Sequence, residues 1–214
     1  MATPENQDTI VVTAFSARFI RAFEELLDIE GGFVDDPVDR GGATKFGISL
    51  RFLASEGAFD EDGDGIADFD LDMDGDIDGI DIRKLTLGDV RYLYDRFFWK
   101  PVKADSYPYP IGEVLFDQAV NGGIGAARKL LQQAINACMA EVGEPRIVVD
   151  GVIGPQTETM LEYVLLHRRM GTAGLLSAYR EAVRDRYRAI VARYPSQKRF
   201  LRGWLARAEK LGRS

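Results

Sequence analysis

The 214-residue chain is long enough for one large domain or two small ones, and its hydrophobic content of 46% is enough to build a buried core. One cysteine, Cys138, excludes an internal disulfide framework, and the longest apolar run is far shorter than a membrane span. The net charge of −7 argues against a dedicated nucleic-acid binder, although residues 160–214 contain 13 Lys/Arg against 4 Asp/Glu. That basic segment predicts a solvated helix face, or a surface that attracts an anionic polymer or a membrane.

The first residues, MATPENQDTIVV, lack the basic and apolar regions of a signal peptide, so we expect synthesis and folding in the cytoplasm. Residues 15–30 (FSARFIRAFEELLDIE) place apolar side chains at helical spacing, and two glycines end the predicted helix. The Gly-, Asp- and Pro-rich residues that follow predict loops and a small hairpin around ATKFGIS (43–49). LRFLASEG (50–57) predicts a short helix that ends at its glycine.

Residues 60–81, DEDGDGIADFDLDMDGDIDGID, contain eleven acids and no base. The acids alternate as in a calcium loop, where a tight turn at glycine points alternate oxygens at one hard cation. The ligands predicted for a complete loop are Asp70, Asp72, Asp74, Asp78 and Asp81, at loop positions 1, 3, 5, 9 and 12. An earlier, incomplete loop offers Asp60, Asp62, Asp64 and Asp68, but has Leu71 at position 12.

These loops predict bound calcium, because eleven like charges in 22 residues repel one another without a counter-ion. A solvated acidic loop without an ion is the alternative. Neither a long exiting helix nor a Met-rich face accompanies the loops, so we predict a structural clip rather than a calcium switch. A calcium-dependent adhesion module would need two complete loops, and one is complete here.

Residues 86–99 (TLGDVRYLYDRFFW) predict a helix with Thr86 as N-cap and Asp89 at its third position. The chain beyond them is predicted to be almost all helix. The predicted helices are 111–121, 124–141, 155–168, 172–194 and 197–211. A boundary near residue 105 divides a first part, 12–104, from a second part, 105–211, and we expect the two to pack as one body.

Four further residues are predicted to have no catalytic or binding role. Trp99 and Trp204 are expected in the core, and Cys138 lies on an apolar helix face. His167 is the only histidine and is expected at a surface or a helix end. Its isolation excludes His-based metal sites and catalytic triads.

Glu30 ends the first predicted helix, where the negative end of the helix dipole disfavours a carboxylate. Together with an expected partial burial, this position is predicted to raise the pKa of the carboxyl group, as a general acid requires. An ordinary helix-end glutamate followed by a C-cap glycine is the alternative for this pattern taken alone.

The stretch EGGFVDDPVDRGGATKFGIS (30–49) resembles the signature of glycoside hydrolase family 108, the phage and prophage endolysin-like N-acetylmuramidases. LYDRFFW (93–99) is similar to the tyrosine-to-tryptophan helix of that family. The segments similar to the associated type 3 peptidoglycan-binding region are LFDQAVNGG (115–123), LLQQAI (130–135), DGVIGPQT (150–157) and FLRGWLAR (200–207). These motifs cover nearly the whole chain in the right order, and an acidic insert is also seen in some members.

The resemblance implies a mainly α, lysozyme-like fold with a very small hairpin near the active site and a large helical C-terminal part. It implies hydrolysis of the β-1,4 bond between N-acetylmuramic acid and N-acetylglucosamine. Glu30 is then the catalytic acid, Asp39 the second acid and Thr44 the hydroxyl that orients water, while Asp35 and Asp36 compete with Asp39. The distance between the two carboxyls decides between inversion and retention, and we favour inversion because a water-orienting hydroxyl suits it.

A long glycan substrate needs a groove lined by aromatic and polar groups. The candidates are Phe33, Phe46, Tyr107, Tyr109 and Asn121, each of which is otherwise a core or turn residue. The expected partner is bacterial peptidoglycan, and we expect a monomer. The resemblance also implies release by a holin or dedicated channel, followed by action on the wall in the periplasm or outside. The alternative on the same fold is a non-catalytic peptidoglycan-binding or secretion-accessory protein.

Overall fold

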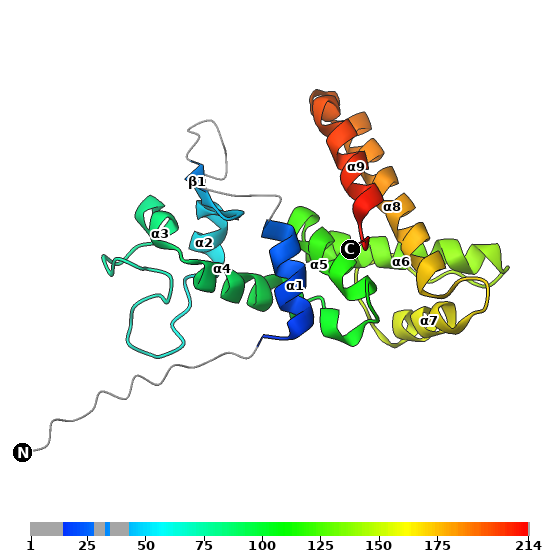
Figure 1. The fold of residues 1–214 in the computed structure, drawn as a ribbon, viewed down its shortest axis with the longest axis horizontal. Coiled ribbons are helices and arrows are strands. Elements are labelled where there is room, and N and C mark those ends of the chain that lie inside the picture. Colours follow the sequence, from blue (N-terminus) through cyan, green and yellow to red (C-terminus); the bar gives the residue numbers. More distant parts are fainter. Residues whose placement is uncertain (1–14, 28–32, 35–42, 214) are drawn as a thin grey trace, which may run out of the picture.

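The computed structural model describes residues 15–27, 33–34 and 43–213 of the chain. These residues form a mainly helical molecule with one small sheet, as the sequence predicts (Figure 1). The acidic loops lie at one end of the molecule and helix α7 (Pro155–Leu166) at the other. Within the described ranges, no helix combines the length and the apolar character needed to span a membrane.

Helix α1 (Ala17–Leu27) matches the described part of the helix predicted at 15–30. Ser16 begins it, because the Ser16 hydroxyl accepts a hydrogen bond from the backbone N–H of Phe19 at 3.1 Å. One face of α1 is buried, through Phe19, Ala22, Phe23 and Leu26. Burial of that face fixes the position of the C-terminal end of α1, which precedes Glu30 in the sequence.

Three two-residue strands form an antiparallel sheet in the order β1 (Phe33–Val34), β2 (Thr44–Lys45) and β3 (Ile48–Ser49). Phe46 and Gly47 join β2 to β3 with φ angles of 51° and 79°. Two left-handed residues in a two-residue loop match the right-handed twist of a hairpin, so the hairpin predicted around ATKFGIS is confirmed. The Ser49 hydroxyl then caps helix α2 (Leu50–Glu56), which ends at Gly57 as predicted.

After the acidic loops comes helix α3 (Gly79–Lys84), which the sequence did not predict. It is followed by α4 (Leu87–Tyr94), which continues into a π-helical turn, η1 (Asp95–Trp99). The capping box of α4 is confirmed, since the Thr86 hydroxyl accepts from the Asp89 amide and the Asp89 carboxylate accepts from the Thr86 amide.

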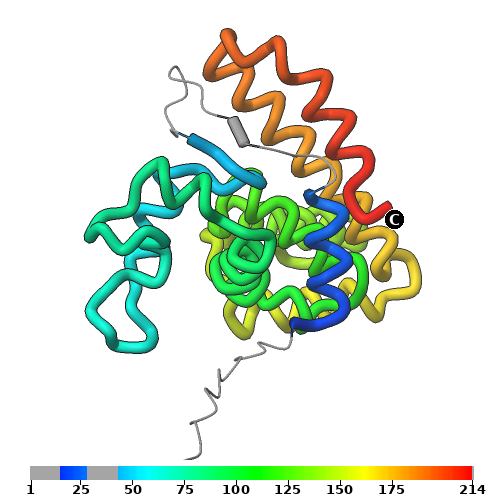
Figure 2. Tube along the Cα trace, turned by 60° about the vertical axis from the view of Figure 1, so that its left-hand side comes forward, coloured from blue at the N-terminus to red at the C-terminus, as the bar shows by residue number. Residues whose placement is uncertain are grey.

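The C-terminal half is helical, as predicted, with boundaries within a few residues of those expected. Its elements are η2 (Ala104–Ser106), α5 (Ile111–Gly122), α6 (Ile124–Glu141), α7, α8 (Gly171–Arg193), η3 (Pro195–Phe200) and α9 (Leu201–Lys210). The 3-10 turn η3 replaces the first turn of the helix predicted at 197–211. Helices α8 and α9 form an antiparallel hairpin that rises from the body on the same side as the small sheet (Figures 1 and 2).

A continuous hydrophobic core joins these elements. Its centre is a cluster of aromatic rings from α1, α4, η1 and α5, with centroid separations of 5.3 to 6.2 Å: Phe19, Phe23, Tyr94, Trp99 and Phe116. Cys138 is buried as predicted, and Trp99 is buried with its indole N–H donating to Asp105. Trp204 is only half-buried, and His167 ends α7, as expected of a helix-end residue.

Candidate active site and acidic loops

Four of the predicted acids lie outside the described residues: Glu30, Asp39, and Asp35 and Asp36, which compete with Asp39. In sequence, Glu30 is three residues from Leu27, the last described residue of α1, and three residues from Phe33 in β1. The backbone of Phe33 pairs with Lys45 of β2. Helix α1 and strand β1 therefore anchor the two ends of the segment that carries Glu30.

Thr44 lies at the start of the middle strand, where it pairs with Val34 on one side and Ser49 on the other. Its side chain is half-buried. Phe46 is half-buried and packs against the core, and its carbonyl accepts a hydrogen bond from the Tyr94 hydroxyl at 3.3 Å. Phe46 has a left-handed backbone, which is costly for a residue with a side chain. The hydrogen bond from Tyr94 holds this turn against α4.

Lys45 attaches the sheet to the acidic insert, which sequence reasoning missed. Its ammonium donates to the carbonyl oxygens of Arg83 and Leu85, at 2.5 and 2.8 Å. These carbonyls belong to the C-terminal end of α3, where carbonyls lack helical partners and a cation is favourable. The strand that carries Thr44 is therefore tied directly to the helix that follows the acidic loops.

The other predicted substrate contacts differ in exposure. Tyr109 is 54% exposed, while Tyr107 is 8% exposed and belongs to the core. Burial raises the pKa of the Tyr107 hydroxyl. Asn121 is exposed near the end of α5, where its amide donates to the backbone carbonyl of Asp117 at 2.7 Å. Tyr109 and Asn121 are thus the more accessible of these candidates.

Two motifs that are distant in the sequence meet beside Asn121. Asp117 of LFDQAVNGG and Arg207 of FLRGWLAR form an ion pair at 2.8 Å, with both side chains largely buried. The Arg186 guanidinium lies over Gly122, where a Cβ atom would be only 2.5 Å from Arg186 Nη1. The glycine of NGG therefore makes room for this arginine. Sequence reasoning did not single out either arginine.

The other two C-terminal motifs also meet. Gln132 of LLQQAI is buried, and its amide donates to Asp150 at 2.9 Å and accepts from the Gly151 N–H at 2.7 Å. Gly151 is left-handed, with a φ of 85°, as this turn requires. The hydrogen bond from Gln132 lowers the pKa of Asp150. These residues hold the turn before α7 and are structural.

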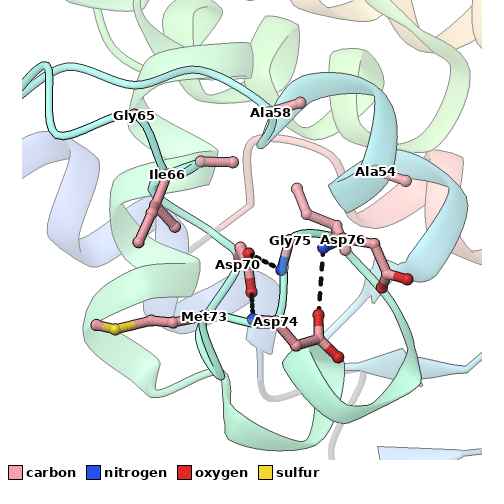
Figure 3. Close-up of a pocket in the computed structure, with 11 residues that line it drawn as sticks. Ala54, Ala58, Gly65, Ile66, Asp70, Met73, Asp74, Gly75 and Asp76 are labelled. Atoms are coloured by element: carbon pink, nitrogen blue, oxygen red, sulfur yellow. Dashed lines mark hydrogen bonds between the residues drawn. The ribbon is translucent and has the colours of Figure 1, made fainter.

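The two acidic loops repeat one local geometry. In each, the first aspartate accepts the backbone N–H of the glycine five residues later: Gly65 donates to Asp60 at 2.9 Å and Gly75 donates to Asp70 at 2.8 Å. Both glycines have left-handed backbones, with φ angles of 89° and 100°. Figure 3 shows the Asp70 carboxylate facing the amides of Asp74 and Gly75.

Carboxylate oxygens gather in both loops. Asp70, Asp72 and Asp74 bring one oxygen each within 4.8 Å of one another, and Asp60, Asp62 and Asp68 do the same. Asp64 is not part of the first group. Asp78 and Asp81 instead form the capping box of α3, with Asp81 fully buried and accepting from the amides of Leu71 and Asp78.

The Asp70 loop fits a hard cation chemically. Asp72 Oδ1 is buried and has no hydrogen-bond partner among the residues that the structure describes. Burial, and then the charges of Asp74 and Asp81, raise the pKa of Asp72, and the charge of Asp74 raises the pKa of Asp76. An all-oxygen group with unrelieved repulsion suits calcium or magnesium. A cavity of about 390 Å³ adjoins it, lined by Ala54, Ala58 and residues of both loops (Figure 3).

The first loop is also fixed to the helix that follows. Glu61 accepts a hydrogen bond from the Tyr92 hydroxyl at 2.9 Å and forms an ion pair with Arg96. The Arg96 guanidinium lies 4.2 Å from the ring centroid of Phe59. The insert therefore contacts α4 and η1 as well as the sheet.

Comparison with known proteins agrees with this architecture. The sequence model of glycosyl hydrolase 108 matches residues 23–123, and that of a predicted peptidoglycan domain matches residues 126–209. No curated protein matches the chain by sequence. The structure of SagA from Brucella abortus is similar over 92% of this chain and 96% of that chain, with 23% identity and a TM-score of 0.58.

The likeness to SagA confirms the expected mainly α, lysozyme-like fold. The two sequence models together span nearly all of the helical body, and LFDQAVNGG (115–123), which resembles the peptidoglycan-binding region, lies within the hydrolase match. Residues 23–123 therefore form a glycosyl hydrolase 108 domain and residues 126–209 a predicted peptidoglycan domain, and the chain is a peptidoglycan-degrading muramidase.

Proposed function

We propose that Glu30 is the general acid of this muramidase and protonates the glycosidic oxygen between N-acetylmuramic acid and N-acetylglucosamine. The matched hydrolase region, residues 23–123, contains Glu30, Asp39 and Thr44. The observation that carries the proposal is the anchoring of the Glu30 segment, by buried α1 on one side and by β1 of the Thr44 sheet on the other. Such anchoring is what a positioned proton donor needs.

In this mechanism Asp39 is ionised and activates water or stabilises the oxocarbenium-like charge, while the Thr44 hydroxyl orients the water. Inversion requires the two carboxyls to lie about 6.5–9.5 Å apart, and retention requires about 5–5.5 Å. We propose inversion, because a water held by a threonine attacks from the face opposite the leaving group. Exposed Asn121 and Tyr109 are the proposed glycan contacts.

The test is lysis of purified sacculi, followed by analysis of the products. Glu30→Gln should lower the lytic rate by about 10²–10⁴-fold, the usual contribution of a general acid, without loss of sacculus binding. Asp39→Asn should be damaging, and more so than Asp35→Asn or Asp36→Asn, which test the competing candidates for the second acid. Products should carry muramic acid at the reducing end, and NMR of the first anomer formed decides between inversion and retention. Full lysis by Glu30→Gln would refute the assignment.

We also propose that the Asp70 loop binds calcium as a structural clip, with Asp70, Asp72 and Asp74 as its central ligands. The buried Oδ1 of Asp72, which has no hydrogen-bond partner in the described part of the chain, supports this proposal. An ion in this loop would fix the position of α3. Lys45 hydrogen-bonds the end of α3, so the ion would also fix the strand that carries Thr44. We place Asp78, Asp81 and the first loop, Asp60, Asp62, Asp64 and Asp68, as secondary candidates.

Calcium at about 100 times its dissociation constant should stabilise the fold by about 2.7 kcal/mol. For a chain of this size, that corresponds to a rise in melting temperature of about 5–10 °C. Asp72→Asn combined with Asp74→Asn should abolish the rise, whereas Asp62→Asn tests the first loop separately. Identical melting curves in excess calcium and excess chelator would remove the proposal.

We propose, finally, that the enzyme acts as a monomer on the cell wall after release from the cytoplasm, with a holin or channel supplying the route. Support comes from the family alone. Expression in a bacterium with and without a co-expressed holin tests this route, since lysis in the absence of any pore would contradict it.

A further inference from the structure

The end of the α8–α9 hairpin, here called the hairpin tip (residues 193–202), projects from the helical body (Figures 1 and 2). From residue 188 to residue 207, not one side chain is buried, so the tip adds little to the core. The whole stretch from residue 186 to residue 208 also contains no acid. It contains seven cations: Arg186, Arg188, Arg193, Lys198, Arg199, Arg202 and Arg207.

The cations at the base of the hairpin and those at the tip differ in their partners. At the base, Arg184 forms ion pairs with Glu181 and Glu209. Arg188 pairs with Glu181 and Asp185, and Arg207 pairs with Asp117. At the tip, Arg193, Lys198, Arg199 and Arg202 form no ion pair with any described carboxylate. The positive charge of the tip is therefore available to an anion outside the protein.

Two large aromatic side chains are exposed between these cations. Tyr194 is 52% exposed and Phe200 is 42% exposed. The Arg193 guanidinium lies 5.3 Å from the Tyr194 ring centroid, and the Arg199 guanidinium lies 4.6 Å from that of Phe200. The Phe200 ring also stacks on the Trp204 ring, with a centroid separation of 5.8 Å, and this contact restricts the orientation of Phe200. The tip thus presents aromatic rings and cations together on one projection.

We propose that the hairpin tip docks onto the surface of an anionic phospholipid bilayer. Aromatic rings favour the interfacial layer of a membrane, and cations favour its anionic headgroups. A soluble polyanion would attract the cations but would gain little from exposed Phe200, so the combination favours a bilayer. Docking would hold the muramidase beside the membrane that adjoins its substrate, and it does not depend on the proposed catalytic residues.

The experiment measures co-sedimentation of the full chain with lipid vesicles. Binding is expected to vesicles of phosphatidylcholine that contain phosphatidylglycerol, but not to vesicles of phosphatidylcholine alone, and it should weaken with salt. Each cation at an anionic surface contributes about fivefold, so Lys198→Gln with Arg199→Gln should weaken binding about 25-fold. Tyr194→Ser with Phe200→Ser should weaken binding about tenfold or more, through lost apolar contact.

The matched control is Arg168→Gln with Arg169→Gln, an adjacent exposed pair on the loop after α7, beside exposed Leu166. This control should bind vesicles as the parent protein does. Unchanged melting temperatures establish that each variant is folded, and lysis of lipid-free sacculi should be unchanged in the Lys198/Arg199 variant and in the control, which lie outside the FLRGWLAR motif. Lysis therefore reports on the muramidase proposal separately from vesicle binding.

Three results would overturn the docking proposal. The first is equal binding to vesicles with and without phosphatidylglycerol. The second is an equal loss in the Arg168/Arg169 control, which would indicate attraction by net charge. The third is a loss in the cation variant but none in the aromatic variant, which would show that the exposed rings do not enter the bilayer and that charge alone attracts the protein.

Discussion

Replacing Gly112 by alanine should destabilise the protein, although alanine is the better helix former. Gly112 is the second residue of α5, and a glycine in a helix is usually less stable than alanine by about 0.5–1 kcal/mol. Here a Cβ atom would lie 2.1 Å from the carbonyl oxygen of Ala104 and 2.9 Å from its carbonyl carbon. Both are backbone atoms, so they can yield only if η2 moves away from α5.

The same Cβ atom would lie 3.0 Å from Arg18 Nη2. Arg18 donates two hydrogen bonds of 2.8 Å to Glu113 and another of 2.8 Å to the Tyr107 carbonyl, and these bonds join α1 to α5. Overpacking usually costs about 1–3 kcal/mol, and strained hydrogen bonds to a charged group add to this. After the helix-propensity gain is subtracted, we expect a net loss of about 2 kcal/mol or more.

Urea and thermal unfolding followed by circular dichroism measure this loss, which corresponds to a fall in melting temperature of about 4–8 °C. Gly203→Ala in α9 is the matched control, because no described atom beyond its chain neighbours and its own helix backbone lies within 4 Å of its Cβ position, and it should be neutral or stabilising. Lysis should fall in Gly112→Ala because α1 leads to Glu30. A Gly112→Ala protein as stable as the parent would refute the reasoning from close contact.

Three other substitutions or reactions test contacts that the fold creates. Lys45→Met should lower the free energy of unfolding by about 1–3 kcal/mol, since the carbonyls at the end of α3 lose their cation. It should also speed proteolysis within residues 60–81. Lys84→Met is the control, because it removes one exposed hydrogen bond. Gln132→Met should raise the pKa of Asp150 in an NMR titration. In the parent protein the Asp150 carboxylate stabilises the fold at neutral pH, and this contribution is lost as the pH falls through its lowered folded-state pKa. A pKa of Asp150 that the substitution leaves unchanged would contradict the hydrogen bond. Burial raises the pKa of the Cys138 thiol to about 11, so a thiol reagent at neutral pH should label the unfolded protein only, and rapid labelling of the folded protein would count against that burial.

The elements that depend on local chemistry were predictable from the sequence. Apolar spacing located the long helices, and Thr86 with Asp89 located the start of α4. The turn at Phe46 and Gly47 lay within the predicted hairpin. In the acidic loops, Asp70 accepts from the amide of Gly75 five residues away, so the short DxDxDG pattern located the turn. Helix α3 escaped prediction because six residues show no clear period, and Asp78 and Asp81, read as calcium ligands, cap it.

Contacts between distant residues were decided only by the tertiary structure. Arg207 hydrogen-bonds Asp117, 90 positions away in the sequence, and Lys45 hydrogen-bonds the carbonyl of Leu85, 40 positions away. Gln132 hydrogen-bonds both Asp150 and Gly151. Periodicity reports which face of a helix is apolar, but it does not report which polar group lies opposite. For the same reason, the basic C-terminus was evident from composition. The fold was needed to show that Arg184, Arg188 and Arg207 at the hairpin base form ion pairs, whereas the tip cations pair with no carboxylate that the structure describes.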